Sequence, residues 1–152
     1  MVEHKTKIGG VHLAPTEVLL RGATPLYAQS AWLDCDEVEA LAGVLNIPIC
    51  TLPANHIITD IDVWVSEAAN SESADDMIQV GWDSDHDAYV TTLDITSIGV
   101  KNPTLGADAK IVVAGARDIL IYYNYTSGPL LADPTTGKVV VTVYYMVAPA
   151  TP

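Results

Sequence analysis

The residues best suited to chemistry lie in one acidic segment, residues 83–87 with the sequence DSDHD. Its three alternating carboxylates resemble the start of an EF-hand calcium loop, and Asp94 stands at the twelfth position of such a loop. The sixth position is Ala88, however, where that loop needs glycine, and the flanking residues have the pattern of strands. We therefore expect a solvated turn between two strands. The candidate calcium ligands that remain are Asp83, Asp85 and Asp87.

No other motif indicates catalysis. The 4 histidines lack the spacing of a zinc-protease motif, and no His-x-His pair begins a cupin metal set. There is no Gly-x-Ser-x-Gly nucleophile motif and no glycine-rich phosphate-binding motif. The glycine-rich, serine-containing motif of trimeric all-β dUTP-hydrolysing enzymes, which have about this length, is missing too. We predict that the chain has no catalytic residue, binds no cofactor and is not an enzyme.

Charge and length exclude several partners. The 152 residues include 7 basic and 19 acidic ones, which gives a net charge of −12. Binding to a nucleic-acid backbone needs clustered Lys and Arg, so nucleic acid is not an expected partner. No window approaches 18 apolar residues, and no apolar stretch of signal-peptide length follows the N-terminus, so we expect a product that is cytosolic when made and is not inserted into a membrane.

Two cysteines are too few for a disulfide framework. Cys35 and Cys50 are 15 residues apart, a spacing that resembles no compact metal site. We expect two free, half-buried thiols rather than a bridge.

Two apolar runs near the C-terminal end, residues 119–125 and 137–147, are the strongest strand signals. Their residues are β-branched or aromatic almost without a break, and glycine, proline and aspartate separate the runs. This pattern predicts an antiparallel pair, covered by a second sheet or by a neighbouring subunit.

Further strands and their turns predict an all-β fold. Strands are predicted over residues 47–53, 56–65, 77–82, 88–95 and 110–114. In the second of these, strict alternation predicts that one face carries Ile57, Thr59, Ile61, Val63 and Val65. The predicted fold class is an antiparallel β-sandwich or jelly roll.

A short helix is predicted before these strands, over residues 34–45. Asp34 can cap it, and Glu37 stands three residues later as in a capping box. The apolar face of this helix would carry Val38, Leu41 and Leu45.

Residues 1–30 are apolar but interrupted by glycine and proline, which predicts an extended N-terminal arm. The arm would dock on its own domain or on a neighbouring chain, and both remain open. The predicted organisation is an arm over residues 1–30, a connector with the short helix over residues 31–50, and a β-sandwich over residues 51–152.

The aromatic residues are 7 tyrosines and 3 tryptophans, with no phenylalanine. Adjacent tyrosines, as at 122–123 and 144–145, place one ring on each face of a strand, so one ring serves the core and the other a second surface. That surface is either ordinary sandwich packing or a subunit interface, with a sugar-binding platform as a third interpretation. The candidate interface residues are Trp64, Tyr122, Tyr144 and Tyr145.

The order of these segments resembles a known family. Residues 57–65, 78–90, 93–99, 119–125 and 137–145 carry the resemblance, a series of strands with a Val-Gly turn and an Asp-rich turn. They look like jelly-roll structural proteins of tailed bacteriophages, over roughly residues 52–147. The pattern carries no catalytic chemistry.

Within that family, a short chain with an apolar arm is similar to capsid decoration (cement) proteins. The resemblance implies a homotrimer on the outer surface of the virion head, bound across subunits of the major capsid protein and stabilising their lattice. It implies that the arm binds the capsid through Ile8, Val11, Leu13, Val18, Leu19 and Leu20. The alternative is a head-fibre or tail-associated binding module that recognises a host glycan.

Overall fold

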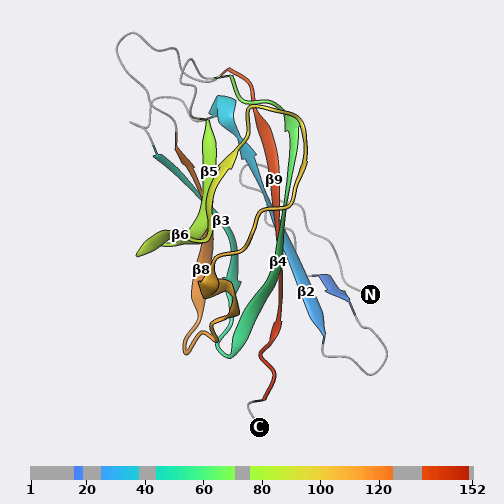
Figure 1. Ribbon diagram of the computed structural model, residues 1–152, viewed down its shortest axis with the longest axis vertical. Helices are drawn as coiled ribbons and strands as arrows, with labels where there is room; N and C mark the ends of the chain where they lie inside the picture. The colour runs from blue at the N-terminus through green and yellow to red at the C-terminus, as the bar shows by residue number, and fades with distance from the viewer. Residues whose placement is uncertain (1–15, 19–24, 38–43, 71–75, 125–134, 151–152) are drawn as a thin grey trace.

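The computed structural model is a sandwich of two antiparallel β-sheets (Figure 1), and it describes residues 16–18, 25–37, 44–70, 76–124 and 135–150. The five-stranded sheet has the order β1-β2-β9-β4-β7. Its strands are β1 (Thr16–Val18), β2 (Leu26–Asp34), β4 (His56–Glu67), β7 (Gly99–Lys101) and β9 (Lys138–Val147). The four-stranded sheet, β3-β8-β5-β6, contains β3 (Val44–Leu52), β5 (Met77–Trp82), β6 (Asp85–Asp94) and β8 (Arg117–Asn124).

The strand pairing is that of a jelly roll. Strand β2 pairs with β9, β3 with β8, β4 with β7 and β5 with β6, so the pairs are nested along the chain. Such nesting is what results when one long antiparallel hairpin is rolled into two facing sheets. The predicted all-β jelly-roll class is confirmed.

Alternation along the strands builds the core between the sheets. In β9 the inward residues Val139, Val141, Val143 and Tyr145 are buried, while their neighbours on the other face are partly exposed. Strand β4 alternates in the same way from Ile61 onward. Because side chains repeat every second residue, one face of each strand of the five-stranded sheet meets the core and the other faces outward.

A β-bulge changes the predicted alternation at the start of β4. The register shifts between Ile58 and Asp60, so Thr59 is the extra residue and is exposed. Ile61, Val63 and Val65 face the core as predicted, but before the bulge it is Ile58, rather than Ile57, that is buried. The prediction for Ile57 and Thr59 was wrong because strict alternation assumes an unbroken ladder.

The predicted pairing of the last two strands was also wrong. Strand β8 lies in the four-stranded sheet and β9 in the five-stranded sheet, on opposite sides of the core (Figure 1). Each strand is so apolar because each is a central strand with neighbours on both sides. Composition showed that the strands are buried, but not which sheet each one joins.

Two local predictions differ from the structure. In place of a helix over residues 34–45, the described part shows the 3₁₀ turn η1 (Cys35–Glu37) and the start of β3 at Val44, and residues 38–43 lie outside the described residues. The Asp34 carboxylate does accept a bond from the Asp36 amide, 3.2 Å away, so the cap serves this short turn. In place of a strand over residues 110–114, the 3₁₀ turn η2 (Ala107–Lys110) leads into a loop.

The sandwich begins earlier in the chain than the predicted border at residue 51. Strands β2 and β3 fall within the segments predicted as arm and connector, and β2 pairs along its whole length with β9. Of the predicted arm, the described parts are the three residues of β1, at the edge of the five-stranded sheet, and residues 25–30.

Candidate interface

The outward side of the five-stranded sheet, called here the outer face, is built from cross-strand rows. The residues of each row are paired across β2, β9 and β4. The rows follow one another at two-residue steps except at the two register shifts of β4, between Ile58 and Asp60 and between Val65 and Glu67. From one end of the sheet to the other, the rows are Asp34–Lys138–Glu67, Trp32–Val140–Trp64, Ser30–Thr142–Asp62, Ala28–Tyr144–Asp60 and Leu26–Met146–Ile57.

The second row is the most apolar and is extended by Val100 of β7, which pairs with Trp64. We call Trp32, Val140, Trp64 and Val100 the tryptophan row. Trp32 is 38% exposed, Trp64 is 49% exposed and Val100 is 67% exposed. Large apolar side chains in contiguous positions on one face are characteristic of a surface that contacts another protein.

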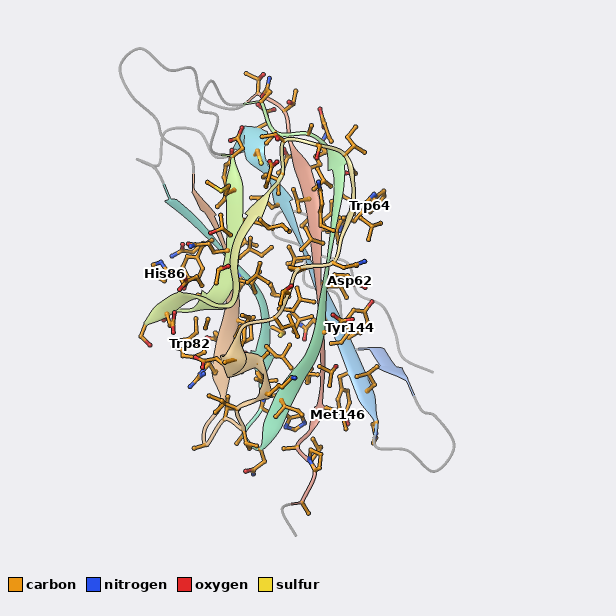
Figure 2. The ribbon with its side chains drawn as sticks, in the orientation of Figure 1. Asp62, Trp64, Trp82, His86, Tyr144 and Met146 are labelled. Atoms are coloured by element: carbon orange, nitrogen blue, oxygen red, sulfur yellow. The ribbon has the colours of Figure 1, made fainter. Side chains whose placement is uncertain are left out.

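Figure 2 shows Trp64, Asp62, Tyr144 and Met146 along the side of the sandwich turned away from the four-stranded sheet. The apolar rows lie on both sides of a polar centre. There Ser30 and Thr142 share a hydrogen bond of 2.8 Å between their hydroxyls. The row beyond it places the Tyr144 ring between Ala28 and Asp60.

Two carboxylates, Asp60 and Asp62, give the centre of the outer face a negative charge. Burial, and then a hydrogen bond to Asp62, raise the pKa of the Tyr144 phenol, and the charge of Asp60 adds to the effect. Asp60 is exposed, and its Oδ1 accepts a bond from the Ile61 amide at 2.9 Å. Among the described residues, Lys138 Nζ forms an ion pair with Glu67 Oε2 at 3.4 Å. Neither Asp60 nor Asp62 forms an ion pair with a Lys or Arg of this part of the chain.

The structure places the four predicted interface residues, three tyrosines and one tryptophan, in different surroundings. Trp64 and Tyr144 lie on the outer face, as the interface prediction requires. Tyr145 points into the core and stacks on Tyr27, with ring centroids 5.4 Å apart. Tyr122 lies on the other sheet and is only 1% exposed, so this chain alone already covers both Tyr122 and Tyr145.

Tyr122 is covered by a residue of its own sheet. The His86 ring of β6 stacks on it at 3.9 Å with an interplanar angle of 13°. Nearby, the Arg117 guanidinium lies 3.5 Å above the Trp82 ring, and Tyr89 meets the same ring edge-on. On the outward side of the four-stranded sheet, the Tyr122 ring is therefore covered within the chain, whereas Arg117 pairs with the core residue Leu52 and Trp82 packs against the core.

The acidic turn does not form a metal cage in the described part of the chain. Strand β6 begins already at Asp85, which shortens the predicted turn. Desolvation and the neighbouring Asp87 carboxylate raise the pKa of Asp85, so these two groups are close together. Within the described residues, no three His, Cys, Asp or Glu side chains are grouped so as to hold a metal ion.

Both thiols are free, and they are buried rather than half-buried. Burial raises the pKa of Cys35 and of Cys50 to about 12, so both stay protonated and unreactive at neutral pH. Cys35 lies beside a buried pair in which the Tyr123 hydroxyl donates to Asp76 Oδ1 at 2.6 Å. This cluster belongs to the core, and its groups are not presented to solvent.

The sequence analysis did not identify three members of the tryptophan row, namely Trp32, Val140 and Val100. Trp32 fell inside the predicted connector, although residues 26–33 alternate with period two: Leu26, Ala28, Ser30 and Trp32 face outward, and Tyr27, Gln29, Ala31 and Leu33 face inward. That alternation was the available signal. The capsid-binding residues predicted in the arm cannot be placed: Ile8, Val11, Leu13, Leu19 and Leu20 lie outside the described residues, and Val18 ends β1.

No family model and no curated protein matches the chain. Among solved structures, a chain of the "Cyanophage Pam1 capsid asymmetric unit" has a similar fold, with a TM-score of 0.53 and 16% sequence identity. The match covers 82% of this chain and 85% of that chain. At this identity the likeness is one of fold. No helix in the described part of the chain is both long and apolar enough to cross a membrane.

Proposed function

We propose that this chain is a non-enzymatic structural protein of a bacteriophage virion. In this proposal it is a capsid decoration protein that binds the outside of the head as a homotrimer and stabilises the lattice of the major capsid protein. The observation that carries the proposal is the tryptophan row, exposed on a jelly roll whose fold is similar to that of a cyanophage capsid chain.

The physical argument begins with exposed apolar area. About half of the Trp64 side chain is in contact with solvent, and a large aromatic side chain buries about 150–250 Å² in all. At about 25 cal/mol per Å², covering the exposed part of this one ring contributes about 2–3 kcal/mol. Trp32 on the same row adds a second ring, and tryptophans at the centre of an interface often contribute most of its binding energy.

Charge favours the outside of a head over the inside. The net charge of −12 disfavours contact with packaged DNA, whose phosphates would repel the chain. An outer protein held by apolar contacts to its neighbours avoids that repulsion. Three copies on one lattice position would also multiply a weak single contact.

The arm proposed to reach the capsid is shorter than predicted. Residues 26–30 belong to β2 and pair with β9, so they are needed for the sheet. The segment available for attachment ends before β1, at residue 15. Deleting residues 1–30 would therefore damage the sandwich rather than remove only an arm.

The test uses capsids of the phage that encodes the chain, freed of outer proteins. The purified full chain is added, and cryo-electron microscopy and thermal release of DNA are measured. We expect density for three copies around three-fold positions on the outer surface, and a higher temperature of DNA release. Absence of binding, or binding only on the inner surface, contradicts the proposal.

A matched pair of variants connects this result to the outer face. Trp64→Asp places a charge in the tryptophan row, whereas Val112→Asp places one at a comparably exposed position in the loop before β8. We expect the first variant to lose capsid binding and the second to keep it. Equal binding by both would show that the outer face is not the contact.

A glycan-binding module is the second candidate, because the half-exposed Trp64 ring could stack on a sugar. A glycan array probed with the full chain, with and without a chelator, distinguishes the two. Binding to a glycan that Trp64→Ala abolishes, without any binding to capsids, would favour the second candidate.

A further inference from the structure

The outer face places two carboxylates beside an exposed ring. Asp60, Asp62 and Trp64 follow one another at two-residue steps on the outward side of β4, and Figure 2 shows the last two. At about 3.4 Å per residue, neighbouring members of this series are about 7 Å apart along the strand. A long side chain of a bound partner that reaches Asp62 therefore also meets the Trp64 ring.

Both carboxylates are held in place by their own chain. The Tyr144 hydroxyl of β9 donates a hydrogen bond to Asp62. The Ile61 amide donates to Asp60 Oδ1 at 2.9 Å, at the bulge of β4. A carboxylate can accept about four hydrogen bonds, so each group still has room for a further donor. The two side chains are thus oriented before any partner binds.

The described cations are engaged elsewhere. Lys138, at one end of the outer face, pairs with Glu67. Lys101 of β7 donates to the Ser97 hydroxyl at 2.7 Å. Within the described part of the chain, no Lys or Arg forms an ion pair with either carboxylate at the centre of the face. The negative charge there is therefore not balanced by a described basic residue.

This charge restricts what can cover the tryptophan row. Asp62 lies in the row next to it, so a partner that covers Trp64 also covers the carboxylate. Removing an ionised carboxylate from water is costly unless a cation pairs with it. A partner that binds the tryptophan row must therefore bring a basic side chain to Asp60 and Asp62.

A second copy of the chain does not meet this requirement. Two outer faces placed against each other would enclose four carboxylates, two from each copy, and each copy has a net charge of −12. Like charges within a contact reduce affinity. A different protein with a basic side chain supplies the charge that the outer face lacks.

Arginine fits this place better than lysine. Its planar guanidinium can form two parallel hydrogen bonds to a carboxylate and can also stack on an aromatic ring. The chain contains one example of such stacking, with Arg117 Cζ 3.5 Å from the centroid of the Trp82 ring. On the outer face, the half-exposed Trp64 ring offers the same kind of surface next to a carboxylate.

We propose that the outer face binds an arginine side chain of its partner protein, with the guanidinium on Asp60 and Asp62 and against the Trp64 ring. Apolar side chains beside that arginine would cover Trp32 and Val140. The inference rests on the proposed function for the identity of the partner, the major capsid protein. In this arrangement the tryptophan row contributes most of the affinity, and the carboxylates select the place on the capsid surface.

The first test uses the free full chain and a peptide probe. The peptide acetyl-Val-Arg-Val-amide, or the same peptide with neutral citrulline in place of arginine, is titrated into ¹⁵N-labelled protein at low salt and followed by NMR. We expect the arginine peptide to shift the amides of Asp60 and Asp62 and the indole of Trp64, and to bind about 5-fold more tightly than the citrulline peptide. Equal binding of both peptides, shifts only around Asp85 and Asp87, or no shifts on β4, each overturn the proposal.

A pair of variants with the same change in charge makes this test specific. Asp60→Asn/Asp62→Asn keeps the shape of both side chains, and the amide oxygens can still accept the bonds from the neighbouring donors. We expect it to bind the two peptides equally. The control Asp83→Asn/Asp87→Asn removes two charges from exposed positions at the turn between β5 and β6, and it should respond as the unmodified chain does. Equal behaviour of the two variants would mean that only net charge matters, and the proposal would be wrong.

Capsid binding separates this inference from the proposed function. Asp60→Asn/Asp62→Asn should bind capsids about 10-fold more weakly than the unmodified chain, and its binding should depend less on salt. If the variant binds as tightly and with the same salt dependence, the arginine contact is overturned and the decoration role remains. If the unmodified chain does not bind capsids, the decoration role is contradicted, while the peptide titration still decides whether the outer face binds arginine.

Discussion

The outward sides of the two sheets differ in how their large rings are covered. On the four-stranded sheet, the His86 ring of β6 lies over the Tyr122 ring of β8, so the cover comes from the same sheet. On the five-stranded sheet, Trp32, Trp64 and Val100 remain exposed, and no described residue lies over them. The large ring on the first surface is covered within one chain, whereas those on the second are left exposed by the described residues.

The backbone explains how the four-stranded sheet covers itself. Strand β6 pairs with β5 at Val80 and again at Trp82, but the register shifts between these pairs, so several residues of β6 bulge past Gly81. His86 is one of these residues. The strands of the other sheet have no comparable excursion over the tryptophan row. The nearest register shift, between Val65 and Glu67 of β4, adds a single residue.

The largest expected effect on stability comes from a side chain at Gly81, where the backbone of the β6 bulge lies against the glycine. A Cβ at Gly81 would lie 2.1 Å from the Asp85 carbonyl oxygen, so Gly81→Ala must push β6 away from β5. We expect a loss of about 3 kcal/mol in the free energy of unfolding, measured with urea. Gly115→Ala is the control, because a Cβ there meets nothing within 4 Å. Similar small losses in both variants would mean that the bulge adapts freely.

The next effect separates binding from stability. Trp32→Ala/Trp64→Ala should weaken capsid binding by about 30-fold or more, the loss of a hot spot of about 2 kcal/mol, and change the unfolding free energy by less than about 1 kcal/mol. Trp82→Ala, which removes the contacts with Arg117 and Tyr89, should do the reverse. Titration of capsids and urea unfolding measure the two quantities. If the double variant Trp32→Ala/Trp64→Ala is less stable than Trp82→Ala, and Trp82→Ala binds capsids more weakly than the double variant, the comparison between the two sheets is wrong.

These two regions also show how far the sequence could predict the structure. The strands at 56–65, 77–82, 119–125 and 137–147 were found because alternation and β-branched residues report burial directly. The pairing of the strands was harder to predict. Strands β8 and β9 follow one another in the chain but lie in different sheets, because the long hairpin of a jelly roll is rolled so that consecutive strands fall on opposite sides of the core. Nothing local in the sequence records that step.

The candidate interface was predicted in part for a similar reason. Trp64 and Tyr144 lie on a face turned away from the core, since each stands one residue from a core position, and their role in an interface stays a prediction. Tyr122 has the same local pattern, yet a ring 36 positions earlier in the chain, that of His86, covers it. Trp32 was not predicted on this surface, because helix-capping residues at Asp34 and Glu37 directly follow the period-two pattern of β2 and favour a helical connector there.

A smaller effect tests the cover over Tyr122. His86→Ala removes the stacked ring, and aromatic pairs of this kind contribute about 0.5–1.5 kcal/mol. We expect a loss of about 1 kcal/mol in unfolding free energy by urea titration, with no change in capsid binding. The control is Asp87→Ala, at the exposed neighbouring position. An unchanged stability in His86→Ala would mean that Tyr122 does not depend on the stacked ring.

The smallest effect reports whether the outer face is dry. Thr142→Val removes one hydroxyl of the 2.8 Å pair with Ser30, at the polar centre of that face. In the free chain, water can replace the partner of the Ser30 hydroxyl, so the loss in unfolding free energy should stay below about 0.5 kcal/mol. On a capsid, where the proposed contact would exclude water, the unpartnered hydroxyl should cost about 1 kcal/mol and weaken binding about 5-fold. Urea unfolding of the free chain and titration of capsids measure the two quantities. Unchanged capsid binding would mean that water still reaches the polar centre of the outer face in the complex.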